Sequence, residues 1–462
     1  MFSTLDKAML TKASGTPEQG ISVAAGSAMA GSEAEAAVPP AVVRHAADSH
    51  IPPQSRTLKE ARAKYVLKNR RQPPARFDAW YRRAVEKQCF IDEYDQISRD
   101  LAAFHQLGTK EFVKRLDAVG TSPNRMFTYD SSRTADGSNG GSWDAMLRKI
   151  ADNLPHARFY FNGLDEPRVL YNTQSEHSVE SELGFSKAAV EWISLPRGQH
   201  EAFLRKHCVV HNAEKPLEVL NDQHGFLIEP DTWLYTTDLV PVMSHTRITP
   251  CFSDIHVPSS YYYPRAAAPA KDKMVPWHKR KPQVFWRGSS TGGHAYKDNW
   301  HRMHRQRMAN IAKKRPELFD IAITAFIQCD KEECDAMHNE FGDSPRVPAD
   351  ASEQYKYVID IDGNTFSGRY LRLLMSGSLV FKMTIFSEFF DDWLVPYKHY
   401  IPVQPDLSDF EQQVEWAVQN DDLAREIAES GRKFVMERIT NEQMECYMEL
   451  LLLELARLGG AE

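Results

Sequence analysis

The sequence contains no run of about 18 consecutive apolar residues, the length that a membrane-spanning helix needs. The N-terminus also lacks the cationic start and apolar core of a signal peptide, so no part of the sequence predicts membrane insertion. Six cysteines occur without C-x-x-C spacing, which argues against a zinc site. Their spacing assigns no disulfide pair, and we interpret the two thiols of "CDKEEC" as unrelated.

An excess of positive charge is missing too, since the net charge is −7. Broad nucleic-acid binding would require a dominant basic surface, so we expect no nucleic-acid partner. No P-loop and no kinase signature occurs, which disfavours phosphoryl transfer. The content of 42% apolar and 26% charged residues is typical of a globular protein, and 462 residues predict two domains.

Composition and periodicity divide the chain into four parts. Residues 1–55, rich in Ala, Gly, Ser and Pro, predict a disordered tether or stalk. Residues 56–245 form a predicted N-terminal lobe, whose first helix begins at a capping box of Thr57 and Glu60. Residues 246–435 alternate strands and helices, which predicts a doubly wound parallel sheet, and 436–462 predict a C-terminal helix. The turn-dense stretch "TSPNRMFTYDSSRTADGSNGGSWD" is interpreted as a loop.

A predicted strand in "QVFWRGSSTGG" runs into a small-residue loop and then a basic helix. Such a loop exposes backbone N–H groups that suit a phosphate, and Arg287 and a helix arginine can each form bidentate hydrogen bonds with a diphosphate. The helix carries Arg302, Arg305 and Arg307, and the motif does not choose among them. A solvated basic helix after an ordinary turn is the simpler alternative.

The stretch "YKYVIDIDGNTFSGRYLRLLMSG" repeats this arrangement, with Arg369 at the start of its helix. Two such loops in one lobe are typical of a site that holds a pyrophosphate from both sides, which favours a nucleotide-diphosphate donor. Asp360 and Asp362 share one face of the strand, so chelation of a metal is geometrically feasible. Arginines beside the same phosphates would make a metal's charge redundant, so we favour a structural role for both aspartates.

Two further carboxylates are candidates for the site. Glu388 follows the next strand and can accept hydrogen bonds from a ribose, although a surface acid is an equally open interpretation. Asp165 lies at the end of the strand in "ARFYFNGLDEPRV", where a general base can face the donor, with Asp254 as its rival and a salt-bridge role as the simpler alternative. For the run Tyr261–Tyr263 we favour packing over stacking on sugar rings.

These motifs, in this order and spacing from about Pro73 to Leu452, resemble glycosyltransferase family 90 of the capsule-associated-protein type. The family includes the animal protein O-glucosyltransferases, and the motif sequences of this chain are closer to those of its fungal-like branch. The resemblance implies a GT-B-like α/β fold with two Rossmann-type lobes and a cleft between them. It also implies inverting transfer from a UDP-sugar without a metal or other cofactor, in the Golgi or another secretory lumen. The chain shows neither signal nor anchor, which leaves the cytosol open. At position 156, after the proline of "NLPHARF", many relatives have an acidic residue where this chain has His156.

By matching motif positions, the resemblance implies Asp165 as the catalytic base. It implies a donor-binding set of Arg287, Gly288, Ser289, Ser367, Gly368, Arg369 and Glu388. We take Arg307 as the helix arginine of this set, although the motif does not choose among the three. The donor is expected to be UDP-xylose, with UDP-glucose next, and the acceptor a hydroxyl of a glycan or glycoprotein. Transfer of glucose or xylose to a protein serine, and a catalytically silent glycan-binding protein, are the alternatives. The second is disfavoured because Asp165, Arg287, Arg369 and Glu388 are all retained.

Overall fold

The computed structural model describes residues 51–122, 125–132, 141–172, 185, 187–207, 223–231, 234–269 and 274–461. All of them belong to the unit His45–Glu462. Residues 1–50 of the predicted tether lie outside the described residues, so the tether stays a prediction, as do the domain boundaries at residues 55, 245 and 435. No helix in the described ranges is long and apolar enough to cross a membrane.

The N-terminal part begins with four helices: α1 (Leu58–Asn69), α2 (Phe77–Glu86), α3 (Asp95–Leu107) and α4 (Thr109–Thr121). The predicted capping box at Thr57 is confirmed. The backbone N–H of Glu60 donates to the Thr57 hydroxyl at 3.2 Å, and the Glu60 carboxylate accepts from the Thr57 N–H at 3.2 Å. Each of these bonds satisfies a donor that the start of a helix leaves unpaired.

A four-stranded sheet follows in the order β1-β2-β3-β4. Its strands are β1 (Met126–Asp130), β2 (Arg158–Asn162), β3 (Met243–Ser244) and β4 (Ile255–His256). β2, β3 and β4 are parallel, whereas β1 is antiparallel to β2. β1 lies in the stretch predicted to be a loop, so that prediction is wrong there. The aromatic residues of β1 oppose those of β2, with Phe127 facing Phe161, and this cross-strand pairing outweighs the flanking turn signals.

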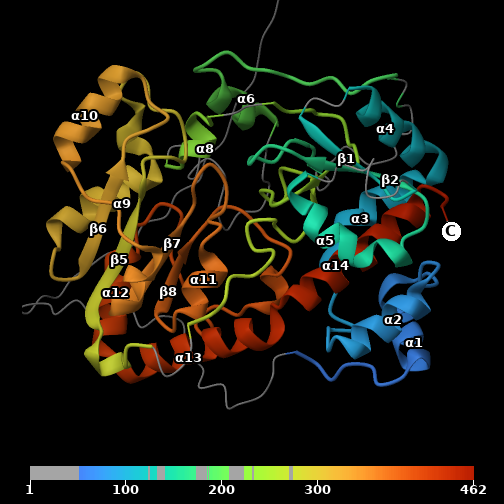
Figure 1. Cartoon of the computed structure of the whole chain (residues 1–462). Helices are drawn as coiled ribbons and strands as arrows, with labels where there is room; N and C mark the ends of the chain where they lie inside the picture. The colour runs from blue at the N-terminus through green and yellow to red at the C-terminus, as the bar shows by residue number, and fades with distance from the viewer. Residues whose placement is uncertain are drawn as a thin grey trace, which may run out of the picture. The chain divides into compact units, whose positions relative to one another are not determined.

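A five-stranded parallel sheet forms the C-terminal part, in the order β6-β5-β7-β8-β9 (Figure 1). Its strands are β5 (Lys281–Ser289), β6 (Phe319–Ala325), β7 (Tyr355–Ile361), β8 (Leu379–Met383) and β9 (Ile401–Pro402). The expected α/β class with two separate sheets is confirmed. The chain leaves β5 for β6 on one side and returns to β7 on the other, so the order of the strands reverses between β5 and β7. Ligands of open α/β sheets bind at such a switch point, outside the carboxyl ends of the strands.

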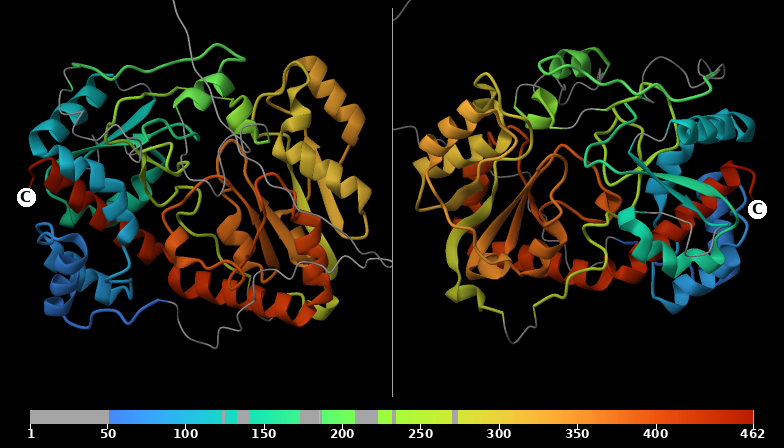
Figure 2. Two further views of the ribbon diagram at one scale, coloured as in Figure 1. Left: turned by 180° about the vertical axis from the view of Figure 1, so that it is seen from behind. Right: turned by 45° about the horizontal axis from the view of Figure 1, so that its top comes forward.

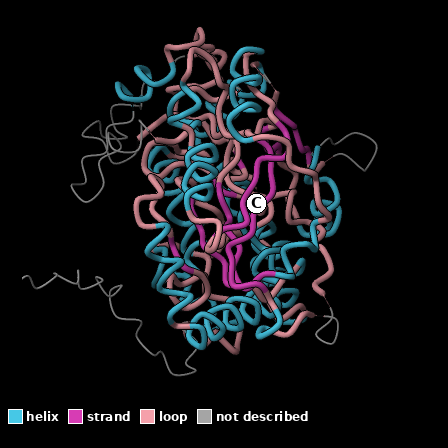
Figure 3. Tube along the Cα trace, turned by 90° about the vertical axis from the view of Figure 1, so that its left-hand side faces the viewer, coloured by secondary structure: helices cyan, strands magenta, loops and turns pink. Residues whose placement is uncertain are grey.

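The remaining helices connect and flank these sheets. They are α5 (Asp144–Ile150), α6 (His200–His207), α8 (Gly225–Ile228), α9 (His304–Lys314), α10 (Lys331–Phe341), α11 (Tyr370–Met375), α12 (Phe410–Gln419), α13 (Asp421–Arg438) and α14 (Asn441–Leu458). Short 3-10 helices lie at η1 (Gly141–Trp143), η2 (Ala151–Asn153), η5 (Trp277–Lys279), η6 (Asn299–Arg302), η7 (Ala349–Gln354) and η8 (Asp391–Trp393). Figure 3 shows the strands enclosed by helices.

The C-terminal helix α14 returns to the N-terminal helices, as both views of Figure 2 show. A disulfide joins Cys89, just after α2, to Cys446 of α14. The Trp80 indole donates to the Cys446 carbonyl at 3.0 Å, and Arg83 pairs with the buried Glu449 at 2.8 Å. The two ends of the described chain are thereby packed into one core.

A second disulfide joins Cys329 to Cys334, so the interpretation of "CDKEEC" as unrelated thiols is wrong. Asp330 is the N-cap of α10, which places Cys329 immediately before the cap and Cys334 at the fourth helical position. Side chains at these two positions meet across the start of a helix, as in a hydrophobic staple. Their Cα atoms are 5.5 Å apart, a separation that a disulfide spans. No cysteine in the described ranges is free.

Candidate functional site

Arg305 lies at the switch point between β5 and β7. It belongs to the first turn of α9 and is buried. Its guanidinium donates to the Asp362 carbonyl at 2.7 Å, the Ser289 carbonyl at 3.1 Å and the Thr291 hydroxyl at 2.6 Å. One side chain thus contacts both the loop after β5 and the loop after β7.

Arg369 approaches the same place from the N-terminal end of α11. It is partly buried and donates to the Arg287 carbonyl at 2.9 Å. The guanidiniums of Arg305 and Arg369 lie over the Trp286 ring, 5.4 Å and 5.5 Å from its centroid. Burial lowers the pKa of both arginines, that of Arg305 to about 9, and the charge of Arg369 contributes to the shift at Arg305.

Neither guanidinium forms a direct ion pair with a described residue, although the buried carboxyls of Asp360 and Asp362 partly offset the lowering of the Arg305 pKa, and that of Asp360 the lowering of the Arg369 pKa. Two neighbouring buried cations are costly unless directly bound counter-ions or a full set of hydrogen bonds compensate them. Two neighbouring arginines in this state form a site suited to a polyanion such as a diphosphate.

The other arginines of this helix region contact different partners. Arg307 donates to the backbone carbonyls of Gln223 and Asp406, and Arg302 pairs with Glu201 at 3.2 Å. We therefore expect Arg305, rather than Arg307, to supply the helix arginine of the site.

The sequence carries a signal that points to this arginine. Arg305 shares a buried face of α9 with Met308, Ala309 and Ala312, because positions three and four apart lie on one face of a helix, and His304 and Gln306 are buried beside it.

Arg287 is held differently from Arg369, although the sequence pairs them. Its guanidinium forms an ion pair with Asp320 of β6 at 2.5 Å and also donates to the Asp320 carbonyl at 2.7 Å. Gly288 follows, and a Cβ there would lie 2.4 Å from the Trp286 ring. The absence of a side chain at this position lets the indole pack beneath the loop and support Arg305.

Glycines bring a third segment against the two loops. The Gly292 N–H donates to the Asn364 side chain at 3.2 Å, which joins the loop after β5 to the loop after β7. Gly225, the first residue of α8, faces Gly292 so closely that a Cβ on Gly225 would lie 1.5 Å from the Gly292 oxygen. The sequence "HGFLIEP" therefore packs backbone against backbone on the phosphate loops.

Two stacked histidines accompany this contact, with the rings of His224 and His304 4.0 Å apart and nearly parallel. Their Nδ1 atoms accept from the backbone N–H groups of Phe226 and Gly225, at 3.2 Å and 3.3 Å. Both rings therefore carry the proton on Nε2, from which His224 donates to the Asp362 carboxylate and His304 to the Asp362 carbonyl. Burial lowers the pKa of both, that of His224 to about 3, so the stack is neutral at physiological pH.

Asp360 and Asp362 are buried at the carboxyl end of β7. Asp362 accepts from the Ile385 N–H at 2.9 Å as well as from His224, which joins β7 to the loop after β8. Burial raises the pKa of Asp360 to about 6 and that of Asp362 to about 7. The described residues contain no cluster of three or more His, Cys, Asp or Glu side chains arranged for a metal.

Glu388 is buried beyond the end of β8. Its carboxylate accepts from Lys382 at 3.2 Å and from the Tyr262 hydroxyl at 2.8 Å. Burial raises the pKa of Glu388, and the charge of Lys382 opposes this shift and favours the carboxylate. Burial alone would lower the pKa of Lys382, but the carboxyls of Glu388, Asp391 and Asp360 outweigh this and raise it. A cavity of about 410 Å³ beside β8 and β9 is lined in part by Lys382.

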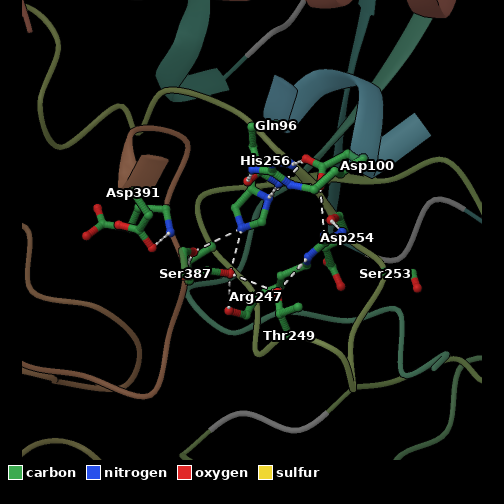
Figure 4. A network of polar contacts seen from close by, with 12 residues as sticks. Gln96, Asp100, Arg247, Thr249, Ser253, Asp254, His256, Ser387 and Asp391 are labelled. Carbon is green, nitrogen blue, oxygen red and sulfur yellow. Dashed lines mark hydrogen bonds and ion pairs between the residues drawn. The ribbon is translucent and has the colours of Figure 1, made fainter. Parts of the chain in front are cut away.

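A polar network anchors the residue before Glu388 to the four-stranded sheet (Figure 4). Asp100 of α3 accepts from His256 Nδ1 at 3.0 Å and pairs with Arg247 at 2.8 Å. His256 Nε2 lies 2.9 Å from the Ser387 hydroxyl. Burial raises the pKa of Asp100, but the charge of Arg247 and the contacts with His256 outweigh it and hold the value at about 2. Glu388 is thus positioned by both sheets.

Asp165 and Asp254 differ clearly in their surroundings. Asp254 is buried and accepts from the backbone N–H groups of Arg168 at 3.0 Å and Val169 at 2.8 Å, so it holds the chain after β2 in place. Asp165 is partly exposed, and among the described residues its one hydrogen-bond partner is the Tyr261 hydroxyl at 2.9 Å. Of the two rivals, Asp165 is the carboxylate that can face a ligand.

Tyr261 connects Asp165 to the second phosphate loop. A Cβ on Gly368 would lie 3.1 Å from the Cβ of Tyr261, so this glycine packs directly against the tyrosine. The backbone carbonyl of neighbouring Ser367 accepts from Tyr262 at 3.2 Å. The candidate base and the loop that carries Arg369 therefore contact opposite ends of one side chain, its hydroxyl and its Cβ.

Comparison with known proteins bears on the C-terminal part. Residues 264–460 match the family described as Glycosyl transferase family 90. Protein O-glucosyltransferase 1 of Rattus norvegicus is 31% identical over 185 residues, which cover 39% of this chain and 43% of the relative. Protein O-glucosyltransferase 3 of Homo sapiens is 28% identical over 172 residues, covering 37% and 31%. The chain thus spans less than half the length of these relatives, and Asp165 and Tyr261 lie outside the matched family region.

Solved structures match only weakly. A crystal structure of TarM aligns with 39% of this chain and 37% of its own, at 15% identity and a TM-score of 0.29. The C-terminal domain of the glycosyl transferase group 1 protein LpcC from Francisella tularensis aligns over 37% of this chain and 95% of its own, at 14% identity and a TM-score of 0.26.

Proposed function

Because residues 264–460 match the model of glycosyl transferase family 90, we propose that this chain transfers a sugar from a UDP-sugar to an acceptor hydroxyl with inversion. The observation that carries the proposal is the pair Arg305 and Arg369, two neighbouring guanidiniums at the switch point without a carboxylate partner in the described chain. The diphosphate of the donor supplies the missing negative charge, and each charge-assisted contact contributes about 1.5–3 kcal/mol.

Transfer proceeds in one displacement. The acceptor hydroxyl gives its proton to Asp165, and its oxygen forms the new bond to the anomeric carbon of the sugar. The bond from that carbon to the β-phosphate oxygen breaks, and its electron pair leaves with UDP. Arg305 and Arg369 stabilise the charge that develops on the leaving diphosphate. Because this charge is already met by arginines, we expect no metal requirement.

Glu388 is the proposed partner of the ribose hydroxyls. A carboxylate has about four acceptor positions, of which Lys382 and Tyr262 occupy two. The contacts of the preceding Ser387 with His256 and Arg247 support a fixed position for this group.

The sugar, the acceptor and the compartment are parts of the same proposal. The fungal-like motif sequences support transfer of xylose to a glycan, whereas the names of the relatives support transfer of glucose to a protein. The disulfides Cys89–Cys446 and Cys329–Cys334 support an oxidising compartment such as the Golgi or another secretory lumen.

The test is release of UDP from UDP-xylose and UDP-glucose, with and without EDTA, by the wild type, Asp165→Asn and the control Asp117→Asn. Asp117 is an exposed carboxylate whose partner is Arg158. We expect one donor to be used, no effect of EDTA, and a loss of about 10²- to 10⁴-fold in Asp165→Asn alone, the usual range for a general base. Full activity of Asp165→Asn would refute the base, and abolition by EDTA would return Asp360 and Asp362 as metal ligands. Failure to bind UDP would favour the glycan-binding alternative.

A further inference from the structure

Each hydroxyl of the run Tyr261–Tyr263 donates to a different carboxylate. In chain order the acceptors are Asp165 at 2.9 Å, Glu388 at 2.8 Å and Glu445 of α14 at 2.7 Å. Three consecutive tyrosines that serve packing alone would not require three carboxylate partners. Two of these partners are the proposed base and the proposed ribose ligand.

The first tyrosine of the run combines exposure with fixed placement. Tyr261 is 61% exposed, an unusual value for so large an aromatic side chain in a structured segment. Its backbone N–H donates to the Ser259 hydroxyl at 3.1 Å, and its Cβ packs against Gly368. The centroid of its ring lies 5.4 Å from that of His245 and 6.1 Å from that of Phe366. The phenol is therefore held rigidly while one side stays accessible.

The hydrogen bond to Asp165 occupies one of its two carboxylate oxygens. Tyr261 donates to Oδ1, and no described residue donates to Oδ2. Partial burial and the nearby Asp165 charge raise the pKa of Tyr261 to about 12, so the phenol stays a donor at every pH at which the enzyme would work. A carboxylate fixed at one oxygen presents the other in a defined direction.

We propose that Tyr261 is a positioning residue for the acceptor step. Its hydroxyl orients Asp165 so that Oδ2 receives the proton of the acceptor hydroxyl, and its contact with Gly368 sets this oxygen relative to the loop that carries Arg369. The inference rests on the proposed function, because it takes Asp165 as the base.

The test compares Tyr261→Phe with Tyr263→Phe. Both variants remove one hydroxyl that donates to a carboxylate, but only the first touches Asp165. We expect Tyr261→Phe to lower kcat for transfer by about ten-fold, less than the loss of the base itself. Because the hydroxyl orients a group that acts in the transition state, the loss should fall on kcat and leave the KM for the acceptor unchanged. The Kd for UDP should stay unchanged, and Tyr263→Phe should match the wild type in all three measurements.

The outcomes separate this inference from the proposed function. If Asp165→Asn abolishes transfer while Tyr261→Phe keeps the wild-type kcat, the positioning role is refuted and the base stands. A rise in the KM for the acceptor without a fall in kcat also overturns the role, because the hydroxyl would then act in acceptor binding and not through Asp165. If Asp165→Asn is fully active, the base and the inference fail together.

Discussion

Replacing Arg369 with methionine removes one positive charge from the switch point and keeps most of the apolar contact with the Trp286 ring. The guanidinium has one hydrogen bond to a described residue, to the Arg287 carbonyl, and no carboxylate partner. The chain alone should therefore lose little, and we expect its free energy of unfolding to change by less than about 1 kcal/mol. Loss of one charged contact to a diphosphate should weaken UDP binding by about 2–3 kcal/mol, or about 30- to 150-fold in Kd.

Calorimetric titration with UDP and thermal unfolding without it measure the two quantities separately. Arg372→Met is the matched control, because Arg372 lies one turn along the same short helix and is exposed. This control should bind UDP as the wild type does. The reasoning would be refuted if Arg369→Met kept its affinity for UDP, or if it lost several kcal/mol of stability in the absence of the nucleotide, since either result makes the arginine a structural residue.

Three further predictions concern stability. The pKa of Asp362 is raised to about 7, so the folded state holds this proton more tightly than the unfolded state, and the stability of the wild type falls as the pH rises from about 4 to about 7. Asp362→Asn should therefore become more stable relative to the wild type across this range. The same pH dependence of the free energy of unfolding in both proteins, measured by urea unfolding, would contradict this. Gly225→Ala places a Cβ 1.5 Å from a carbonyl oxygen of the facing loop and should lower the free energy of unfolding by about 3 kcal/mol or more. Gly342→Ala is the control: no atom lies within 4 Å of its Cβ, so it should lose only the strain energy of a positive φ. Equal losses of Tm in the two variants would refute the packing argument. Replacing Cys89 and Cys446 by serine opens a loop of 357 residues and should lower the free energy of unfolding by up to about 5 kcal/mol. Replacing Cys329 and Cys334, which are five residues apart, should lower it by about 2 kcal/mol. A smaller loss for the Cys89–Cys446 pair in denaturant titrations would contradict this.

The sequence predicts what depends on local chemistry. The capping box at Thr57 needs only residues three positions apart, and its helix begins where expected. The alternation of strands and helices in the C-terminal half leads to the parallel sheet, because βαβ connections leave few other arrangements. The two small-residue loops meet at the switch point for the same reason, since both follow parallel strands that are neighbours in the sheet.

The sequence fails where distant packing decides. Arg302, Arg305 and Arg307 look equivalent in the one-dimensional pattern, and only the packing of α9 on the sheet turns Arg305 onto the loops. Its place on the apolar stripe of the helix was the available signal. The strand β1 is another case, because its pairing with β2 depends on residues about 30 positions away, which no local turn signal reports.

The disulfide Cys329–Cys334 belongs to an intermediate class. Its spacing fits the positions that flank an N-cap, but that pattern becomes visible only once Asp330 is known to begin the helix. No sequence pattern predicts the stacked pair His224 and His304, since the two residues lie 80 positions apart and only the folded chain brings their rings together beside Asp362.

The most direct test of the central claim is a crystal structure of the chain with UDP. The diphosphate should lie within hydrogen-bond distance of both Arg305 and Arg369, over the loops that follow β5 and β7, with Glu388 on the ribose. A diphosphate bound away from these loops, for example in the cavity beside β8 and β9, would show that the paired arginines are not the donor site and would contradict the proposed function in its present form.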